Sequence, residues 1–387
     1  MASVVTFLGT RSEIIKLSPL IPLLSHRFDH ALVHSGQHDT REMEGMLFEE
    51  LRLPRADVNL QTGSAPGAQQ IARMMIGLEQ ILLERRPDAL IVCGGSNTAL
   101  AGALTGAKLS TRVAHVEAGV RTFNPRAPEE INRMLIDRMS SWLFAPDDIA
   151  RDHLLAEGLD DQNIHVVGSM TVDACRRQLR PAEARSIVSE LKLVPYEYIV
   201  LTLHHAENTT PETLREIVEA INALSRLWPI VFPIHPRTLR LLGDGTPFDS
   251  AQGKPFGENV RVISPLGYLD MLSLTRQARV LLTDSSGLQE EAAVLGTPAL
   301  VMRNETECPS LIEAGANALV GNTYRLLMDR AWPLIASDAA LDSMRHRALS
   351  LPGGAAMRIL RALQRDLGAA TDAQPAAALA VGNARTG

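Results

Sequence analysis

Short apolar runs alternate with helix-length segments along most of the chain. In the first half these runs are VVTFLG (4–9), ALVHSG (31–36), ALIVCGG (89–95), RVAHVEAG (112–119), WLFAP (142–146) and IHVVGS (164–169). Each is almost continuously apolar, which is typical of strands buried on both faces of a parallel sheet. The segments between them are amphipathic. In residues 128–139, for example, Ile131, Leu135 and Met139 share one helical face at i, i+4 spacing.

The same alternation starts again after a connecting segment at 177–196. The second set of runs is YIVLTLH (198–204), IVFPIHP (230–236), VRVISP (260–265), VLLTDSS (280–286), PALVMR (298–303) and ALVG (318–321). Two βα arrays predict an α/β protein with two Rossmann-like, doubly wound domains that face each other across a cleft. We expect these domains to span residues 1–176 and 177–354. Residues 368–387 have little to bury, so we expect a disordered tail there.

Composition narrows the range of functions. The chain has 387 residues, a net charge of −6 and only 4% aromatic residues, which argues against a nucleic-acid partner. Its three cysteines show no metal-knuckle spacing and are too few for a disulfide framework. No 18-residue apolar stretch and no N-terminal signal are visible, so we expect no membrane association and a cytoplasmic protein. We expect no metal site and no cofactor.

Polar residues gather where the predicted strands end, which is where open parallel sheets bind ligands. Arg11 and Lys16 follow the first strand and could bind phosphate or be ordinary surface charges. Glu117 ends an apolar strand, where a partly buried carboxylate needs a partner. The seventh strand ends in His204 and His205. The eighth ends in His235, which could present its imidazole to phosphate or stiffen a turn.

The sequence Asp284-Ser285-Ser286-Gly287 precedes a helix. Small residues at a helix N-terminus let backbone N–H groups approach an anion such as a nucleotide diphosphate. An ordinary helix cap is the alternative explanation. In the same helix, Glu290 or Glu291 could hold ribose hydroxyls. Carboxylates and a strand-end histidine near a phosphate site predict proton-transfer chemistry on a molecule like a sugar nucleotide.

These residues lie in motifs that resemble those of the non-hydrolysing UDP-N-acetylglucosamine 2-epimerases. The matching motifs run in the family's order from about residue 5 to about residue 325: GTRSEIIKLSPLI, SGQH, HVEAGVRTF, PEEINR, RMSSWLFAP, LTLHHAEN, HPRT, DSSGLQEEAAVLGTP and VMRNETE. The resemblance implies the domain arrangement of GT-B glycosyltransferases, a homodimer, and a last helix (355–367) that returns to the N-terminal domain. It also implies a reaction in which a base removes the C2 proton, UDP leaves, and UDP adds back to give the C2 epimer.

The resemblance also implies roles for particular residues. The catalytic residues that it implies are Arg11, Glu117, Glu129 and His204. The substrate-binding residues that we expect are Lys16, Gly95, His205, His235, Met271 (beside the uracil), Ser285, Ser286, Gly287 and Glu291 (at the ribose).

The chain departs from the family's pattern at several positions around the predicted site. Gly95 replaces an aspartate usually counted among the acid–base residues, and His205 replaces an arginine after the catalytic histidine. Ser286 replaces a glycine, and Cys308 and Ser310 replace an arginine and an acid. Gly95 either slows the family reaction or leaves space for another ligand. The sequence therefore keeps an alternative open: a diverged transferase or hydrolase that uses the same leaving-group site on a sugar nucleotide or phosphosugar. A non-catalytic sensor is a third option, against which the retained acid–base residues argue.

Overall fold

The computed structural model describes residues 1–37, 41–243, 255–348 and 351–372. The chain divides into two compact units. Unit 1 holds Met1–Phe48, Arg52–Met170 and the chain from Gly354 on, and unit 2 holds Glu49–Leu51 and Thr171–Gly353. The N-terminal portion of unit 1 thus ends six residues before the predicted boundary at residue 176 (176 − 170 = 6).

The sheet of unit 1 has seven parallel strands within the described residues, in the order β3-β2-β1-β4-β5-β6-β7. The strands are β1 (Ser3–Leu8), β2 (Asp29–His34), β3 (Val58–Asn59), β4 (Ala89–Cys93), β5 (Arg112–Val116), β6 (Trp142–Ala145) and β7 (Ile164–Val166). The order reverses between β1 and β4, so the carboxyl ends of β1, β4 and β5 lie next to each other. This reversal is where doubly wound sheets bind ligands.

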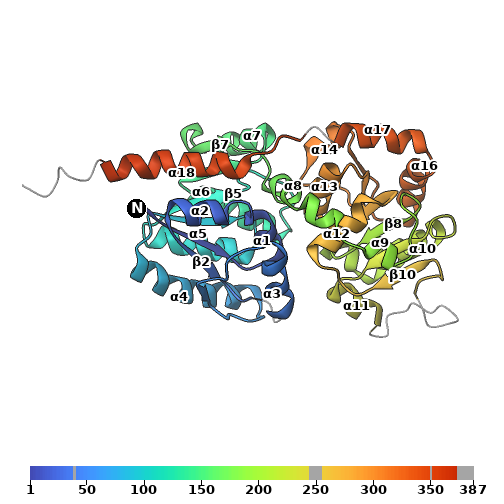
Figure 1. Ribbon diagram of the computed structural model, residues 1–387, viewed down its shortest axis with the longest axis horizontal. Helices are drawn as coiled ribbons and strands as arrows, with labels where there is room; N and C mark the ends of the chain where they lie inside the picture. Colours follow the sequence, from blue (N-terminus) through green and yellow to red (C-terminus); the bar gives the residue numbers. More distant parts are fainter. Residues whose placement is uncertain (38–40, 244–254, 349–350, 373–387) are drawn as a thin grey trace, which may run out of the picture. The chain divides into compact units, whose positions relative to one another are not determined.

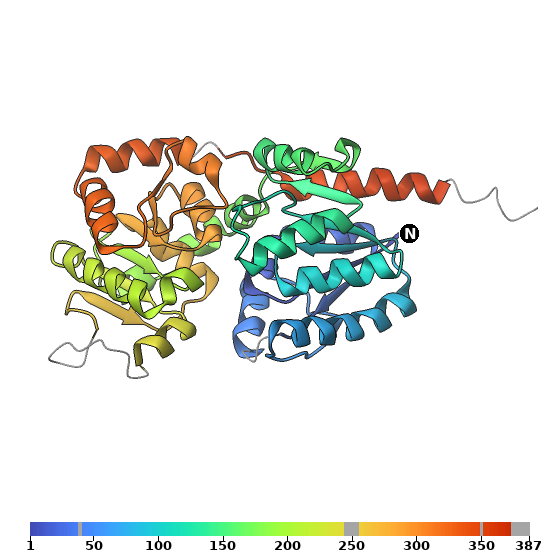
Figure 2. The ribbon, with the colours of Figure 1, turned by 180° about the vertical axis from the view of Figure 1, so that it is seen from behind.

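Helices connect and cover these strands. They are α1 (Arg11–Leu17), α2 (Ile21–Arg27), α3 (Arg41–Glu50), α4 (Gly67–Arg85), α5 (Asn97–Lys108), α6 (Pro128–Met139), α7 (Asp148–Ala156) and the 3-10 helix η1 (Asp161–Asn163). Figure 2 shows α4, α5 and α6, coloured blue to green, side by side over the sheet. Small residues let α5 approach the sheet closely. A Cβ on Gly102 would lie 2.7 Å from Val92 Cγ1.

The last helix, α18 (Ala355–Asp372), belongs to unit 1, where it packs on α2 (Figure 1). Trp142 Nε1 donates a hydrogen bond of 2.8 Å to Asp366, and Arg358 Nε donates one of 2.6 Å to the Val167 carbonyl. The helix extends five residues past the expected end at residue 367 (372 − 367 = 5). Residues 373–387 of the expected tail lie outside the described residues.

Unit 2 repeats the plan with six parallel strands in the part of the chain that the structure describes, in the order β10-β9-β8-β11-β12-β13. The strands are β8 (Ile199–Thr202), β9 (Ile230–Pro233), β10 (Val260–Ile263), β11 (Val280–Thr283), β12 (Ala299–Val301) and β13 (Asn317–Leu319). The helices are α8 (Met170–Glu183), α9 (Ile187–Glu190), the 3-10 helix η2 (Ala206–Thr209), α10 (Pro211–Leu224), α11 (Pro236–Gly243), α12 (Tyr268–Arg276), α13 (Ser286–Leu295), α14 (Pro309–Glu313), α15 (Tyr324–Leu326), the π-helix η3 (Leu327–Ala331), α16 (Trp332–Ile335) and α17 (Asp338–Ala348).

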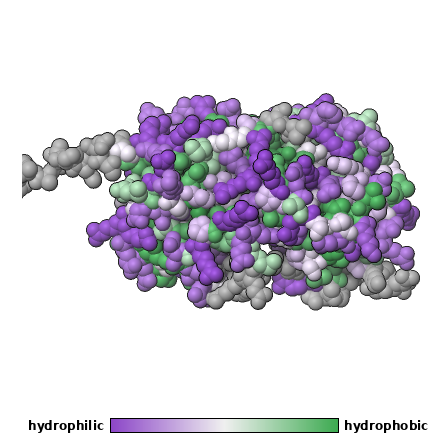
Figure 3. Space-filling model, in the orientation of Figure 1, coloured by the Kyte–Doolittle hydropathy of each residue, from purple (hydrophilic) through white to green (hydrophobic). Residues whose placement is uncertain are grey.

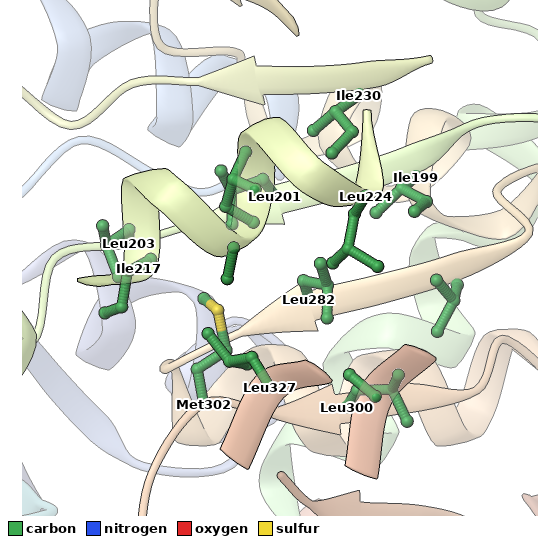
Figure 4. Close-up of a cluster of buried hydrophobic side chains, with 14 of the residues drawn as sticks. Ile199, Leu201, Leu203, Ile217, Leu224, Ile230, Leu282, Leu300, Met302 and Leu327 are labelled. Atoms are coloured by element: carbon green, nitrogen blue, oxygen red, sulfur yellow. The ribbon is translucent and has the colours of Figure 1, made fainter. Parts of the chain in front are cut away.

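Alternate residues of the unit 2 strands fill a core against α10. Ile199 and Leu201 of β8 point to the same cluster as Leu224 of α10 and Leu282 of β11 (Figure 4). The surface contrasts with this core: hydrophilic residues cover much of the face drawn in Figure 3. Burial of these apolar side chains is the main stabilising contribution to each sheet.

The prediction of an α/β protein with two Rossmann-like domains is confirmed. Each of the twelve predicted runs contains a strand, and β3 is an additional short strand that the apolar pattern did not indicate. The strands end one to three residues before the predicted runs do, because the last residues of the runs lie in the connections that follow the strands or, for Ser286, in the next helix. Nowhere in the described residues does a helix combine the length and hydropathy that a membrane span requires.

The apolar face that the sequence indicated on α6 is only partly buried. Ile131 and Leu135 are 49% and 48% exposed, whereas Met139 packs against the core of unit 1. The buried side of α6 instead includes Asn132, Arg133 and Asp137. A helix that presents polar side chains inward needs hydrogen-bond partners for them, and these partners form part of the site described next.

Candidate active-site residues in the two units

A cavity of about 180 Å³ lies in unit 1 where β1, β4 and β5 end. Its lining comes from these strand ends, from the turns that follow them and from α1 and α6: Thr10, Ser12, Glu13, Lys16, Cys93, Gly94, Gly95, Ser96, Glu117, Val120, Glu129 and Arg133. The predicted residues Lys16, Gly95, Glu117 and Glu129 are all among them. Arg11 lies in the first turn of α1 and is exposed.

The turn from β1 to α1 is held by a capping box. Thr10 accepts a hydrogen bond from Glu13 N, and the Glu13 carboxylate accepts hydrogen bonds from Gly9 N and Thr10 N at 2.7 and 2.8 Å. Ser96 Oγ donates to the other carboxylate oxygen of Glu13. Burial raises the pKa of Glu13, and these hydrogen bonds oppose that rise. Glu13 therefore joins the turn after β1 to the turn after β4. The sequence did not indicate this role.

Glu117 is the best-defined carboxylate of the cavity. Its backbone has φ of +69°, a left-handed conformation that is rare for a residue with a side chain and turns it away from the strand direction. Lys16 Nζ lies 2.6 Å from Glu117 Oε2, and the two side chains are 15% and 13% exposed. The partner that a partly buried Glu117 requires is thus Lys16.

The two glutamates at the start of α6 have different surroundings. Glu130 accepts hydrogen bonds from the Thr122 and Phe123 amides and forms an ion pair of 2.8 Å with Arg133. Burial would raise the pKa of Glu130, but the Arg133 guanidinium and these amides lower it below its ordinary value. Glu130 therefore holds the loop that precedes α6 in place through the Thr122 and Phe123 amides. Glu129 and Arg133 line the cavity, and Arg133 is a site residue that the predictions did not include.

Gly95 does not leave open space where the family's aspartate would be. A Cβ built on Gly95 would lie 2.7 Å from the Glu129 carbonyl oxygen and 2.8 Å from Arg133 Cγ. Asn132 Nδ2 also donates a hydrogen bond of 2.9 Å to the Gly95 carbonyl. Atoms of α6 therefore occupy the volume into which a side chain at position 95 would point, which argues against the alternative that glycine leaves space there for another ligand.

In unit 2, His204 faces a buried carboxylate. His204 Nδ1 lies 3.2 Å from Asp284 Oδ1, and the imidazole is 41% exposed while Asp284 is buried. Asp284 Oδ2 accepts hydrogen bonds from the His204 and His205 amides at 2.9 and 2.8 Å. Burial would raise the pKa of Asp284, but the His204 ring and the two amides lower it overall. An ionised Asp284 selects the ring orientation in which Nε2 of His204 points away from the carboxylate.

Two further histidines lie near His204. The ring of His235 is 5.6 Å from that of His204, at an interplanar angle of 34°. Burial and the Arg303 guanidinium lower the pKa of His205, so this ring is neutral at neutral pH. His205 therefore does not carry the positive charge of the arginine that it replaces.

The residues of the predicted anion site form the N-terminus of a helix, as the sequence indicated. Ser285 is the N-cap residue of α13 and accepts a hydrogen bond from Leu288 N, and Ser286 and Gly287 form the first turn. A Cβ on Gly287 would have no described atom within 4 Å, so a ligand can approach this backbone closely. Cys308 Sγ lies 3.8 Å from the Ser286 carbonyl oxygen. Glu291 lies on the same helix and is buried, and Met271 packs in the core beneath it with Ala292.

Within the described ranges, no group of three or more His, Cys, Asp or Glu side chains is arranged to hold a metal ion. Carboxylates and imidazoles such as these can transfer protons, and the first turn of a helix such as α13 suits an anionic group.

Known proteins are similar to this chain in sequence and in fold. The model of the UDP-N-acetylglucosamine 2-epimerase family matches residues 23–364. The chain is 43% identical to the UDP-N-acetylglucosamine 2-epimerase of Methanocaldococcus jannaschii, over 83% of this chain and 89% of that protein. It is 36% identical to the UDP-2,3-diacetamido-2,3-dideoxy-D-glucuronate 2-epimerase of Pseudomonas aeruginosa, over 85% of this chain and 91% of that protein.

Solved structures agree with these sequence relatives. The crystal structure of the Methanocaldococcus jannaschii UDP-GlcNAc 2-epimerase in complex with UDP-GlcNAc and UDP superposes with a TM-score of 0.86 at 40% identity, covering 94% of this chain and all of that one. The Neisseria meningitidis UDP-GlcNAc 2-epimerase bound to UDP-GlcNAc superposes with a TM-score of 0.83 at 27% identity, covering 94% of this chain and all of that one. The chain therefore belongs to the UDP-N-acetylglucosamine 2-epimerase family.

Proposed function

We propose that this protein is an isomerase that inverts C2 of UDP-N-acetylglucosamine or a closely related sugar nucleotide. The observation that carries the proposal is the pairing of Lys16 with Glu117 in a cavity that Glu129 also lines. The C2 hydrogen of such a sugar is not acidic, so its removal requires a positioned base and stabilisation of the leaving group. Family membership supports this reaction.

The residues of unit 1 supply the acid–base groups in this proposal. Glu117 and Glu129 are the carboxylates that remove and return the C2 proton. Lys16 holds the Glu117 side chain in one orientation, since the ammonium lies within hydrogen-bond distance. Arg11 is assigned to the phosphate, because a guanidinium suits bidentate phosphate binding.

The residues of unit 2 supply the leaving-group site. The backbone of Ser285, Ser286 and Gly287 opens α13, where N–H groups and the helix dipole stabilise the charge that develops on UDP as the C1–O bond breaks. His204 is assigned the role of donor: it gives the departing phosphate either a proton or a hydrogen bond. In this assignment Glu291 and Met271 contact the nucleoside, His205 and His235 border the phosphate, and Gly95 contributes backbone to the sugar site.

The transferase or hydrolase alternative is not favoured by the comparisons. Both alternatives would use the same leaving-group site but pass the sugar to water or another acceptor. Incubation with UDP-GlcNAc, followed by proton and phosphorus NMR, separates the outcomes. The proposal predicts a mixture of the substrate and its C2 epimer, whereas free UDP with released sugar would indicate hydrolysis.

Association of two chains is part of the proposal. Ile131, Met134 and Leu135 lie on one face of α6 at i, i+3 and i+4 and are 49%, 48% and 48% exposed. A two-fold interface buries the same patch from both copies, so these side chains suit a homodimer. Light scattering should give a dimer mass for the wild type and a monomer mass for Met134→Glu/Leu135→Glu. A monomeric wild type would refute this part.

A cytoplasmic location completes the proposal. The three cysteines are free, and Cys93 and Cys175 are buried, which suits a reducing compartment. Fractionation of cells that express the tagged protein tests this location directly.

A further inference from the structure

His115 is completely buried in β5, two residues before Glu117, and both of its ring nitrogens contact oxygen atoms. Nδ1 lies 2.6 Å from Asp137 Oδ1 of α6. Nε2 lies 2.9 Å from the carbonyl oxygen of Gly94, in the turn that follows β4.

Both of these oxygen atoms are acceptors. A carbonyl oxygen has no proton to donate. Asp137 is held as a carboxylate, because its other oxygen accepts hydrogen bonds from Arg121 Nη2 at 2.7 Å and from Gly119 N at 3.2 Å. Burial would raise the pKa of Asp137, but the charges of His115 and Arg121 lower it overall. A neutral imidazole has only one N–H, so it would leave one of the two contacts without a proton.

We infer that His115 is a positioning residue that donates a hydrogen bond from each ring nitrogen and fixes the Gly94 turn and Glu117 for proton transfer. This inference rests on the proposed epimerase function.

The contacts of His115 connect three parts of the cavity wall. Gly94 has φ of +68° and its amide donates to the Val116 carbonyl, so the turn after β4 is held against β5. The imidazolium adds a second connection between the same two strand ends. Through Asp137 it also reaches α6, the helix that carries Glu129 and Arg133. Loss of one proton would therefore disturb the β4 turn or α6.

The charges around His115 balance. Arg121 pairs with Asp137 on one side and bidentately with Glu157 on the other, at 2.8 Å for each contact. His153 lies at the edge of this group, with Nδ1 2.9 Å from the Gly119 carbonyl. His115 and Arg121 are thus the cations of one network, and Asp137 and Glu157 are its carboxylates. Asp137 lies between His115 and Arg121. Such a balance allows an imidazolium to exist without contact with water.

Nitrogen-15 NMR of the ring tests the charge state in the wild-type protein. We expect both nitrogens of His115 to show the protonated signature, because each faces an acceptor oxygen. A neutral-ring spectrum at pH 8 would overturn the inference. This measurement needs no substrate, so a wild type without epimerase activity would refute the proposed function and leave this result standing.

His115→Gln tests the positioning role. A glutamine amide has a single nitrogen and cannot donate to two acceptors on opposite sides. We expect a fall in kcat of about 10–100-fold with KM for UDP-GlcNAc unchanged, and a shift of the Gly94 and Gly95 amide resonances. Asp137→Asn should give the same kcat/KM separation if His115→Gln fails to fold.

Arg151→Gln is the matched control, because it breaks an exposed ion pair with Asp161 elsewhere in unit 1 and should change neither kcat nor these resonances. A folded His115→Gln enzyme with wild-type kcat, or one in which only KM changes, would show that His115 does not position the catalytic groups.

Discussion

Lys16 and Glu117 are 101 residues apart in the sequence, yet Lys16 Nζ lies 2.6 Å from Glu117 Oε2. The topology of the sheet explains this proximity. β1 pairs with β4 and β4 pairs with β5, so the residues that follow β1 and β5 meet at one edge of the sheet. The pair combines a carboxylate that could act as a base with the cation that orients it.

Lys16→Met should remove that cation and leave Glu117 partly buried without its partner. We expect kcat for UDP-GlcNAc epimerisation to fall by at least about 10²-fold. The free energy of unfolding should fall by about 1–3 kcal/mol. Steady-state kinetics and urea unfolding measure both effects. Lys16→Arg keeps the charge and should retain more activity than Lys16→Met; equal loss in the two variants would contradict this role of the charge.

Gly95→Asp should not restore the family's aspartate. The new Cβ would lie 2.7 Å from the Glu129 carbonyl oxygen, so α6 would have to move. We expect a loss of about 1–3 kcal/mol in unfolding free energy and a lower kcat. Gly95→Ala has the same steric conflict without a charge and should lose similar stability. A higher kcat for Gly95→Asp than for the wild type would show that the cavity accommodates the carboxylate.

Asp284→Asn should disturb the orientation of His204 while keeping the size of the side chain. An amide cannot attract the His204 ring as a carboxylate does, and its N–H₂ group can face the amide donors of His204 and His205. We expect kcat to fall by about 10–100-fold with little change in UDP affinity. Kinetics and calorimetry separate the two quantities. A proportionate loss of UDP binding would mean that Asp284 acts on the anion site instead.

Much of the fold was predictable because the strands are nearly continuous apolar runs. The short strand β3 was missed because it has two residues, both exposed. The exposure of Ile131 and Leu135 was not predicted, because the inward face of α6 at this end of the helix carries Asn132, Arg133 and Asp137. Periodicity identifies the apolar face of a helix, but it does not state what that face contacts.

The sequence predicted which residues belong to the site better than it predicted which of them contact each other. Lys16, Gly95, Glu117 and Glu129 all line one cavity. The contact of Asp284 with His204 was not predicted, because an Asp that precedes a helix is usually interpreted as its N-cap residue. In the structure Ser285 caps α13, and Asp284 contacts His204. The conflict at Gly95 depends on the distance between the turn after β4 and helix α6, which no local sequence pattern contains.

Glu13→Gln should change how stability depends on pH. Burial raises the pKa of Glu13 in the folded state, so the folded protein binds this proton more tightly than the unfolded chain does. The contribution of Glu13 to stability is therefore present below the ordinary glutamate pKa and is lost as pH rises through the raised value. Glutamine does not titrate. The unfolding free energy of the variant, relative to the wild type, should increase between about pH 4 and pH 8. A difference that stays constant or decreases over this range would contradict the raised pKa.

The central claim is that this protein removes and returns the C2 proton of a UDP sugar. Incubation of the wild-type protein with UDP-GlcNAc in deuterium oxide, followed by mass spectrometry and NMR at C2, tests this claim most directly. We predict that deuterium enters at C2 of both the substrate and its C2 epimer, and that Lys16→Met slows this incorporation. Free UDP with released sugar, or substrate without deuterium at C2, would contradict the account.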